Sequence, residues 1–260
     1  MKTWKKIVLG VSLISLFLGG GLVAWGYSQG GLTDLQNQTK SEQDYVKKEV
    51  DDFSKIDIKS SSYNVLIKNG DVDKATLSYY QKTKNPIDTS VKDGQLTIND
   101  NNSELDSTSN KHINFFGLKD LVRLSTLNKE VRNKTIVITL PKKQTIDFLK
   151  VDLATGNLDL SNSTIKQADI NLNVGDLTFT KMIVSNLKAN LDVGSVDSNH
   201  TLFTNSDLSI AMGDYSGDNL IFNGHNKLDV TSGDIEIALK DYTLNVQADS
   251  HSGEVDITNN

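Results

Sequence analysis

The sequence predicts an all-β protein, a β-solenoid with coils of 19–20 residues that is preceded by a single transmembrane helix. Three observations lead to this prediction. Six glycines recur at a nearly constant spacing, apolar and polar residues alternate around each glycine, and one uncharged stretch lies near the amino terminus. With 260 residues the chain is long enough to bury a core. It contains no cysteine, which excludes disulfide scaffolds, thiolate metal sites and cysteine nucleophiles.

The first element, residues 1–27, is interpreted as a cytoplasmic stub and a membrane anchor. Lys2, Lys5 and Lys6 precede residues 7–25, a stretch of 19 residues without a charge. As a helix this stretch would be about 28 Å long, close to the thickness of the hydrocarbon layer. The lysines orient it with the amino terminus in the cytoplasm, so we expect the rest of the chain to be extracytoplasmic at the cell membrane.

A cleaved signal peptide is the alternative for this element, because Ala24 and Gly26 are small residues that suit a cleavage site. Residues 28–52 are polar and lack a hydrophobic period after Leu35. They are interpreted as a linker.

Residues 53–145 are predicted to form β-rich coils with an insertion. Turn signals at residues 69–71 and 93–94 separate stretches in which apolar and polar residues alternate. We expect these strands to be the first, irregular coils or a β-rich cap of the same solenoid, so that the extracytoplasmic part is one continuous body. The expected strands lie at residues 53–58, 63–67, 75–79, 95–98 and 135–140.

The insertion, residues 101–133, is the candidate interaction segment. A polar run leads into apolar residues near helical spacing, with basic residues around them. One interpretation is a basic, aromatic loop that contacts anionic lipid or a wall polymer. The other is a capping segment whose apolar residues pack over an open end of the solenoid. The candidate residues are Lys111, Phe115, Phe116, Lys119, Arg123 and Arg132.

Residues 146–260 contain the regular repeats. Around each glycine, the residues five and three positions before it and two positions after it are mostly apolar, which is the period of a strand. One unit of this length cannot bury its apolar face, whereas stacked units form a continuous core. Glycine is expected at the bend, where a positive φ or a close approach is needed. The repeat glycines are Gly156, Gly175, Gly194, Gly213, Gly233 and Gly253.

The polar positions of the repeats are expected to form ladders on the surface. Asn, Asp, Ser and Thr dominate the positions four before, one after and three after each glycine. Amides and hydroxyls can bond along such a stack, whereas repeated carboxylates repel one another. The Ca²⁺-binding nonapeptide and the EF-hand spacing are both absent, so no metal site is predicted.

No catalytic signature is found in the sequence. The four histidines, His112, His200, His225 and His251, form no HExxH or i,i+4 pair, and neither a phosphate-binding loop nor a nucleophile elbow is present. Some solenoids act on glycans, but the repeats contain no arginine and no aromatic cluster that would build a cleft. We therefore predict a protein that is not an enzyme and that needs no cofactor.

Charge differs between the two halves. Residues 146–260 contain 17 Asp and Glu against 6 Lys and Arg, a net charge of −11, whereas residues 1–145 carry +5. The acidic half would repel phosphates, so nucleic acid is not expected as a partner. The expected partners are membrane lipid through the anchor and either a cell-wall polymer or a membrane protein.

The six repeats, the stretch FSKIDIKSSSYNVLIKNGD at residues 53–71 and the Ile-Thr-Leu-Pro turn at residues 138–141 resemble the bacterial putative-adhesin β-solenoid family of unknown function. With the amino-terminal span, the chain looks most like the LiaG-type members found in cell-envelope stress operons. The resemblance implies a surface-exposed domain without enzymatic activity, and it supplies no ligand or catalytic residue. Ser198 and Gly217 depart from the repeat pattern.

Two functions follow as expectations. The first is a membrane-anchored, extracytoplasmic module that binds a component of the cell envelope. The alternative is a regulatory or structural partner of a cell-envelope stress-response membrane system.

Overall fold

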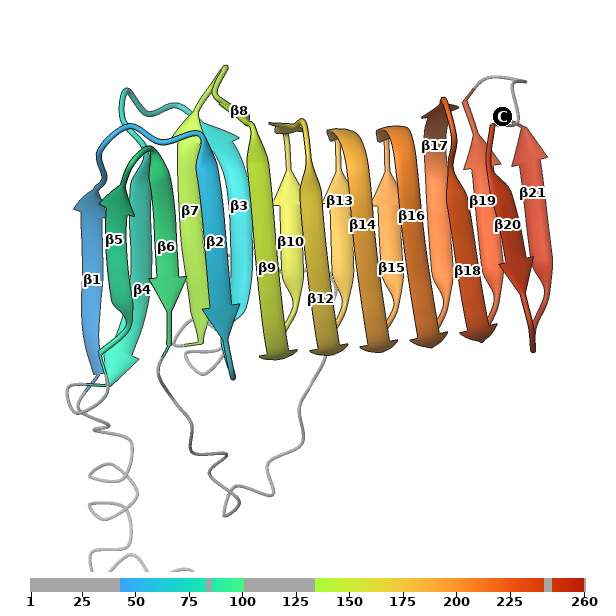
Figure 1. Ribbon diagram of the computed structural model, residues 1–260, viewed down its shortest axis with the longest axis horizontal. Helices are drawn as coiled ribbons and strands as arrows, with labels where there is room; N and C mark the ends of the chain where they lie inside the picture. Colours follow the sequence, from blue (N-terminus) through green and yellow to red (C-terminus); the bar gives the residue numbers. More distant parts are fainter. Residues whose placement is uncertain (1–42, 83–85, 101–133, 241–244, 260) are drawn as a thin grey trace, which may run out of the picture. The chain divides into compact units, whose positions relative to one another are not determined.

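The computed structural model describes residues 43–82, 86–100, 134–240 and 245–259. Residues Asp44–Asn260 make up one compact unit. The described residues form strands, turns and bends without a helix, and the unit is a β-solenoid of about six turns (Figure 1). The all-β solenoid prediction is therefore confirmed.

The strands follow one another along the chain with short connections in the regular part. They are β1 Gln43–Glu49, β2 Lys55–Ser60, β3 Asn64–Gly70, β4 Thr76–Lys82, β5 Asp88–Lys92, β6 Gln95–Asn99, β7 Thr135–Pro141, β8 Thr145–Ile146, β9 Phe148–Thr155, β10 Leu158–Ser161, β11 Thr164–Ile165, β12 Ala168–Val174, β13 Leu177–Thr180, β14 Ile183–Val193, β15 Val196–Asn199, β16 Leu202–Met212, β17 Tyr215–Asn223, β18 Lys227–Ser232, β19 Ile235–Leu239, β20 Gln247–Ser250 and β21 Val255–Asn259.

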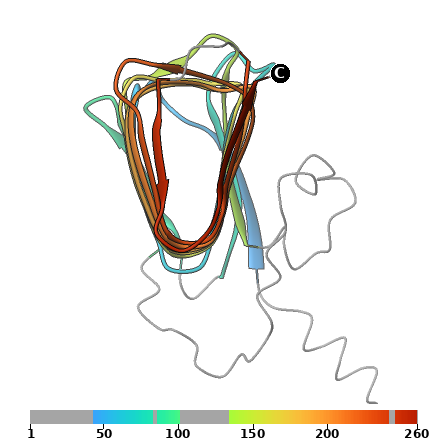
Figure 2. The same cartoon turned by 90° about the vertical axis from the view of Figure 1, so that its right-hand side faces the viewer.

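Two parallel sheets form the long sides of the solenoid. Sheet A contains β3, β10, β13, β15, β17, β19 and β21, and sheet B contains β2, β9, β12, β14, β16, β18 and β20. In Figure 2, a view along the stack, the two sides meet at a narrow bend at the bottom. The repeat glycines lie at this bend, between β9 and β10 and their equivalents in later coils. We call it the glycine corner.

The register is the one that the repeats predict. In sheet B, Ile170 pairs with Val151 on one side and Ala189 on the other, so the positions five before each glycine are stacked. In sheet A, Leu177 pairs with Leu158 and Val196, which are two after each glycine. These side chains point inward and are at most 1% exposed. Each apolar position of the repeat thus becomes one internal column.

A short third side closes each coil, and the sequence reading missed it. Its ladders contain only two or three residues, such as Thr164 and Ile165 paired with Ile183 and Val184. Two residues are too few to show an alternating pattern, which explains why the sequence analysis did not predict this side. The inner residues of this side form a buried column, Ile146, Ile165, Val184, Phe203 and Phe222.

The first coils do not stack in chain order. The coil of β2 and β3 pairs directly with the first regular coil, Val65 with Leu158 in sheet A and Ile58 with Val151 in sheet B. The later strands β6 and β7 pair with its other side. The coil that comes first in the sequence therefore lies between two coils that come later. Strand pairing between distant segments selects this order, and no local pattern encodes it.

Antiparallel strands cover the end of the solenoid beyond β6 and β7. Strand β5 pairs with β6, β4 pairs with β7, and β1 pairs with β4. These strands extend the two sheets beyond the last parallel coil.

Two predictions fall on residues that the structure does not describe. The expected membrane span, residues 7–25, and the candidate interaction segment, residues 101–133, lie outside the described residues. None of the described residues forms a helix long and apolar enough to cross a membrane.

Candidate functional surface

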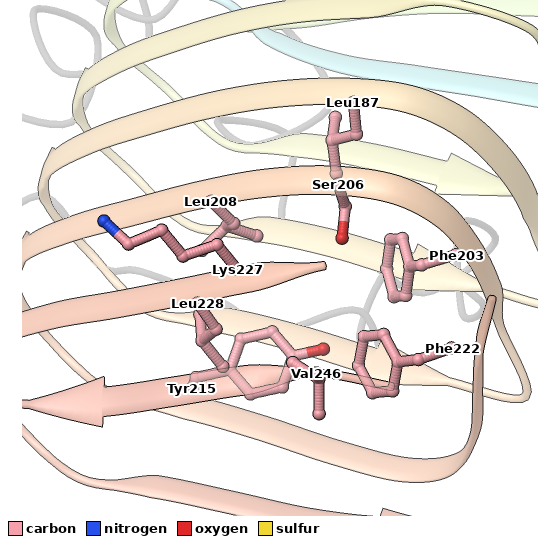
Figure 3. A pocket seen from close by; sticks show the side chains of 9 residues that line it. All are labelled: Leu187, Phe203, Ser206, Leu208, Tyr215, Phe222, Lys227, Leu228 and Val246. Carbon is pink, nitrogen blue, oxygen red and sulfur yellow. The ribbon is translucent and has the colours of Figure 1, made fainter. Parts of the chain in front are cut away.

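Two hollows were found among the described residues, and both are small. The first lies inside the last coils, among Phe203, Tyr215, Phe222 and neighbouring aliphatic side chains (Figure 3). Its volume of about 10 Å³ is room for about one water molecule. The second is a shallow polar hollow of about 190 Å³ that Lys48, Glu49 and Thr89 line near the capped end. Neither has the size of a cleft for a drug-sized ligand, so the candidate site is a surface.

The glycine corner is a place where successive backbones touch. At Gly194 φ is +148°, and an added Cβ would lie 2.0 Å from the carbonyl oxygen of Gly175 in the coil before. The Gly194 N–H donates to the carbonyl oxygen of Met212 in the coil after, at 3.0 Å. Any side chain at this position would enter the neighbouring backbone, so the repeat requires glycine.

A side-chain ladder holds the coils together just after each glycine. The Asp176 N–H donates to Oδ1 of Asn157, and the Ser195 N–H donates to Oδ1 of Asp176, each at 3.0 Å. The same bond joins Asp234 to Asp214 at 2.9 Å and Glu254 to Asp234 at 2.8 Å. A carboxylate that accepts a backbone N–H gains a charge-assisted bond, which offsets its repulsion by the next carboxylate. The sequence analysis expected bonds between two side chains, whereas this ladder is made of bonds from backbone N–H groups to side-chain oxygens.

Bonds between side chains do occur on the outer face of sheet B, four residues before each glycine. The Asn171 side chain donates to Asp152, and the Asn190 side chain donates to Asn171, each at 2.9 Å. Farther along the same column, Asp229 pairs with Lys227 at 3.2 Å. This part of the expected amide ladder is therefore present.

The neighbouring column of sheet B alternates in charge along the solenoid. Asp169 stacks between Lys150 and Lys188, and Asp207 stacks between Lys188 and Lys227. Adjacent strands lie about 4.8 Å apart, so each of these two aspartates has a positive charge on both sides. The sequence reading missed this alternation, because the residues are 19 or 20 positions apart in the chain and the column lies outside the apolar ones.

The outer face of sheet A is acidic. We call the column three residues after each glycine the acidic strip. At its far end, Glu236 lies opposite Asp256 in the strand register, and both residues are exposed. No ion pair between described residues includes Glu236 or Asp256. The sheet A strands of the six regular coils contain no lysine or arginine. The acidic strip consists of Asp159, Thr178, Asp197, Ser216, Glu236 and Asp256.

Asp159 differs from the rest of the strip because it is 2% exposed. Burial raises the pKa of its carboxyl from 3.8 to about 7, a hydrogen bond with the Thr178 side chain opposes the shift, and the charges of Asp176 and Asp197 add to it. Its Oδ2 has no hydrogen-bond partner. A buried carboxyl oxygen without a donor is costly, so this position needs an explanation.

The two ends of the candidate interaction segment are fixed at the glycine corner. The Asp100 carboxylate accepts from Ser60 Oγ at 2.7 Å and from the Ser61 N–H at 2.9 Å. On the other side of the segment, the carbonyl of Lys134 accepts from the Asn64 N–H at 2.8 Å. Asp100 and Lys134, which flank the segment, therefore both lie at this corner. The structure does not place Lys111, Phe115, Phe116, Lys119, Arg123 or Arg132.

The described histidines do not come together. His200 has φ of +52° at the bend after sheet A, and its Nδ1 lies 2.6 Å from Asn199 Oδ1. His251 Nδ1 lies 3.5 Å from Asp229 Oδ1. His225 is exposed. Among the described residues, no group of three histidines and carboxylates is placed to hold a metal ion.

The two positions that depart from the repeat are compensated by their neighbours. Gly217 keeps the register with Ser198 and Ile237. An added Cβ at Gly217 would lie 2.4 Å from Leu220 Cδ1 and 3.0 Å from Tyr215 Cε1. The Tyr215 ring and the Leu220 side chain thus fill the space that small residues leave. The register between β17 and β19 shifts between Gly217 and Leu220.

Comparison with known proteins places residues 53–260 in a family model described as Toastrack DUF4097. A putative adhesin from Bacteroides fragilis NCTC 9343 is 16% identical with a TM-score of 0.41, over 85% of this chain and 98% of that chain. A putative cell adhesion protein from Clostridium sporogenes ATCC 15579 is 14% identical with a TM-score of 0.37, over 84% and 100%. The TM-scores are low, so the family match alone carries the conclusion. A search of curated proteins finds no match.

Proposed function

This chain belongs to the Toastrack DUF4097 family, and on that premise we propose that it is a membrane-anchored, extracytoplasmic module that binds a component of the cell envelope without catalysing a reaction. The family match confirms the resemblance of residues 53–260 to a β-solenoid family. The likeness to LiaG-type members of cell-envelope stress operons is part of the proposal.

The observation that carries the proposal is the repetition of surface groups. Each regular coil presents polar residues at the same positions on sheets A and B. Equivalent positions in successive coils are separated by one strand spacing, about 4.8 Å. A linear ligand with a repeating structure can contact several coils at once, so that weak contacts add up along its length. A surface of this kind suits binding better than chemistry on one small substrate.

Membrane anchoring in this proposal is supported by residues 7–25 alone, with Lys2, Lys5 and Lys6 before them. Its test is to express the full chain in a bacterium, extract the membranes with alkaline carbonate and sequence the amino terminus. We expect an intact terminus in the membrane pellet. A terminus that begins after Gly26 would replace the anchor by a cleaved signal peptide.

Binding is tested by co-sedimentation of the compact unit, residues 44–260, with wall sacculi and separately with anionic vesicles, across salt and with and without Ca²⁺. We expect saturable binding to one of them. No binding to either overturns the proposal of an envelope-binding module.

The alternative function, docking to a membrane protein of a stress-response system, is favoured by one observation. The Asp100 carboxylate and the Lys134 carbonyl hold the two residues that flank residues 101–133 at one corner of the solenoid, and the sequence of that segment is basic. The variant K119Q/R123Q/R132Q separates the two functions. Loss of partner docking with polymer binding intact supports the alternative, and the reverse result supports the binding module.

A further inference from the structure

We infer that the outer face of sheet B is the interface of a dimer, in which a second copy of this chain packs face to face against it. This inference goes beyond the proposed function and does not depend on it. Three properties of the face lead to it: one column of side chains alternates in charge, the order of the side chains is self-complementary, and the face is flat.

The alternating column contains an even number of charges. Strand β6 continues sheet B beyond β2, so the face has eight parallel strands, β6, β2, β9, β12, β14, β16, β18 and β20. The middle six strands carry what we call the charged column, with the uncharged Thr97 and Gln247 at its two ends. It consists of Asp57, Lys150, Asp169, Lys188, Asp207 and Lys227. The column therefore begins with an anion and ends with a cation.

An even, alternating column is complementary to itself after a two-fold rotation. An axis that runs parallel to the strands, between β12 and β14, reverses the order of the coils and keeps each side chain at its level along the strand. It places Asp169 opposite Lys188 of the second copy. An axis through a strand would instead place like charges opposite each other. The other facing pairs are Lys150 with Asp207 and Asp57 with Lys227.

The neighbouring column, four residues before each glycine, fits the same axis although its residues follow a different order. Lys59 comes to lie opposite Asp229 of the second copy, and Asn171 comes to lie opposite Asn190. The other facing pairs are Asp152 with Ser209 and Asn99 with Asp249. In neither column do two like charges face each other, so the face is self-complementary over all eight strands.

The charges at the centre of the face are not used within the chain. Asp169, Lys188 and Asp207 occur in no ion pair between described residues. Lys188 and Asp207 are exposed, and Asp169 is half-buried. Lys150 and Lys227 each pair with an aspartate on their own strand, at 3.7 Å and 3.2 Å. A second copy supplies a counter-charge to each of the three central residues.

The face is flat and has the area of a specific interface. In Figure 2 the successive regular coils superimpose when they are viewed along the stack, so the sheet does not turn the charged column away from a second copy. Eight strands about 4.8 Å apart, with about five residues each at about 3.3 Å, cover roughly 600 Å² per copy. This is at the lower end of the range for specific interfaces.

Sheet A does not have these properties. The sheet A strands of the six regular coils contain no lysine or arginine, so this face offers no cation to the carboxylates of a second copy. Glu236 and Asp256, which are exposed there, provide a matched control for a change in net charge.

The direction of the axis agrees with the proposed membrane anchor. Because the axis runs parallel to the strands, the glycine corners of both copies lie on the same side of the dimer. Strand β1 begins at the corner end of the solenoid (Figure 1), so both chains enter the dimer from that side. Two chains anchored in one membrane can therefore form this dimer.

The test measures self-association of residues 44–260, the unit that contains all described core residues, by sedimentation velocity over a concentration series. We expect a dimer whose Kd rises at least about tenfold between about 50 mM and about 500 mM salt, because charges carry the interface. The variants D169N/D207N and K150Q/K188Q each remove the same four facing ion pairs, and each should raise Kd at least about tenfold. The control E236Q/D256N removes two carboxylates from sheet A and should change Kd less than about twofold.

A mixture of the two sheet B variants separates facing charges from a general effect of charge or folding. In a mixed dimer, Lys150 and Lys188 of the D169N/D207N chain face Asp207 and Asp169 of the K150Q/K188Q chain, so two of the four ion pairs return. With one variant labelled at its amino terminus, the mixed dimer should form at least about threefold more tightly than either variant binds itself. Thermal melts show that the variants are folded.

Four results would each overturn the inference. They are a monomer at every concentration up to about 1 mM, an association that does not weaken as salt rises, a loss in the sheet A control equal to that of the sheet B variants, and a mixture that associates no more tightly than its components.

Discussion

Substitution of Gly194 by alanine tests whether close backbone contact at the glycine corner holds the solenoid together. The new Cβ would lie 2.0 Å from the Gly175 carbonyl oxygen and 2.6 Å from its carbon. Ordinary contacts are about 3.5 Å or longer, so one coil must move by more than about 1 Å relative to the next. The atom in the way belongs to backbone, and no side-chain rotation can relieve the clash.

The cost has two parts. A side chain at φ of +148° costs roughly 1–3 kcal/mol, because this region suits glycine only. Separation of these two coils also weakens two bonds between them, from the Gly175 N–H to the Val193 carbonyl at 2.9 Å and from the Ser195 N–H to Asp176 Oδ1 at 3.0 Å, at roughly 0.5–1.5 kcal/mol each. We expect Gly194→Ala to lower the free energy of unfolding by about 2–6 kcal/mol.

Gly94→Ala is the matched control. Gly94 also has a positive φ, +72°, but no heavy atom lies within 4 Å of the added Cβ. Its cost should stay near the roughly 1 kcal/mol of a left-handed residue. Urea unfolding of residues 44–260 followed by far-ultraviolet circular dichroism measures both, since Trp4 and Trp25 lie outside this fragment. Equal midpoint shifts for the two variants would refute the reasoning.

Three more predictions concern single side chains. Burial raises the pKa of Asp159 to about 7, above its unfolded value of 3.8, so the stability that its protonation supplies is present below about pH 4 and is lost as pH rises to about 7. Asp159→Asn should remove this pH dependence and stabilise the fold by up to roughly 4 kcal/mol at pH 8. Urea melts at several pH values measure it, and an unchanged pH dependence in the variant would contradict the assignment. Phe203→Ala should lower the free energy of unfolding by about 3–5 kcal/mol in the same melts, because the ring packs edge-on against Phe179 at 5.2 Å and stacks on Phe222 at 5.6 Å. A loss below about 1 kcal/mol would mean that the third side adds little to the stability of the fold. Asp100→Ala should lower the free energy of unfolding by about 2–3 kcal/mol, since it leaves the Ser60 and Ser61 donors unpaired. It should also speed proteolysis between residues 100 and 134. Unchanged cleavage rates would argue against the role of Asp100 in fixing the chain at the corner.

The regular coils could be predicted because their pattern is local. Residues that point inward repeat at fixed distances from each glycine, so Val151, Ile170 and Ala189 could be assigned to one column before any coordinates were known. The need for glycine at the corner followed from the same repeat. The detail that the obstacle is the carbonyl oxygen of the preceding coil required the structure.

The candidate surface was predicted less completely. The positions of the polar columns were predicted from the sequence, but the interactions that each column makes were not. Asp176 and Asp197 are both acidic residues shortly after a glycine, yet the Asp176 carboxylate accepts the backbone N–H of the next coil, whereas Asp197 belongs to the exposed acidic strip. A difference of two positions decides this, because only the first position after the glycine lies at the corner, where the carboxylate reaches the next backbone.

By itself the sequence determined the solenoid, the length of its coils, the internal columns and the unequal charge of the two halves, since all of these depend on spacing along the chain. Only the tertiary structure decided that the coil of β2 and β3 lies between the coil of β6 and β7 and the coil of β9 and β10. It also decided that a third side closes each coil and that charges on sheet B alternate while those on sheet A do not. These features come from pairing between residues far apart in the chain. Such pairing depends on which strand edges remain open after the others have paired, and no short segment of sequence records that choice.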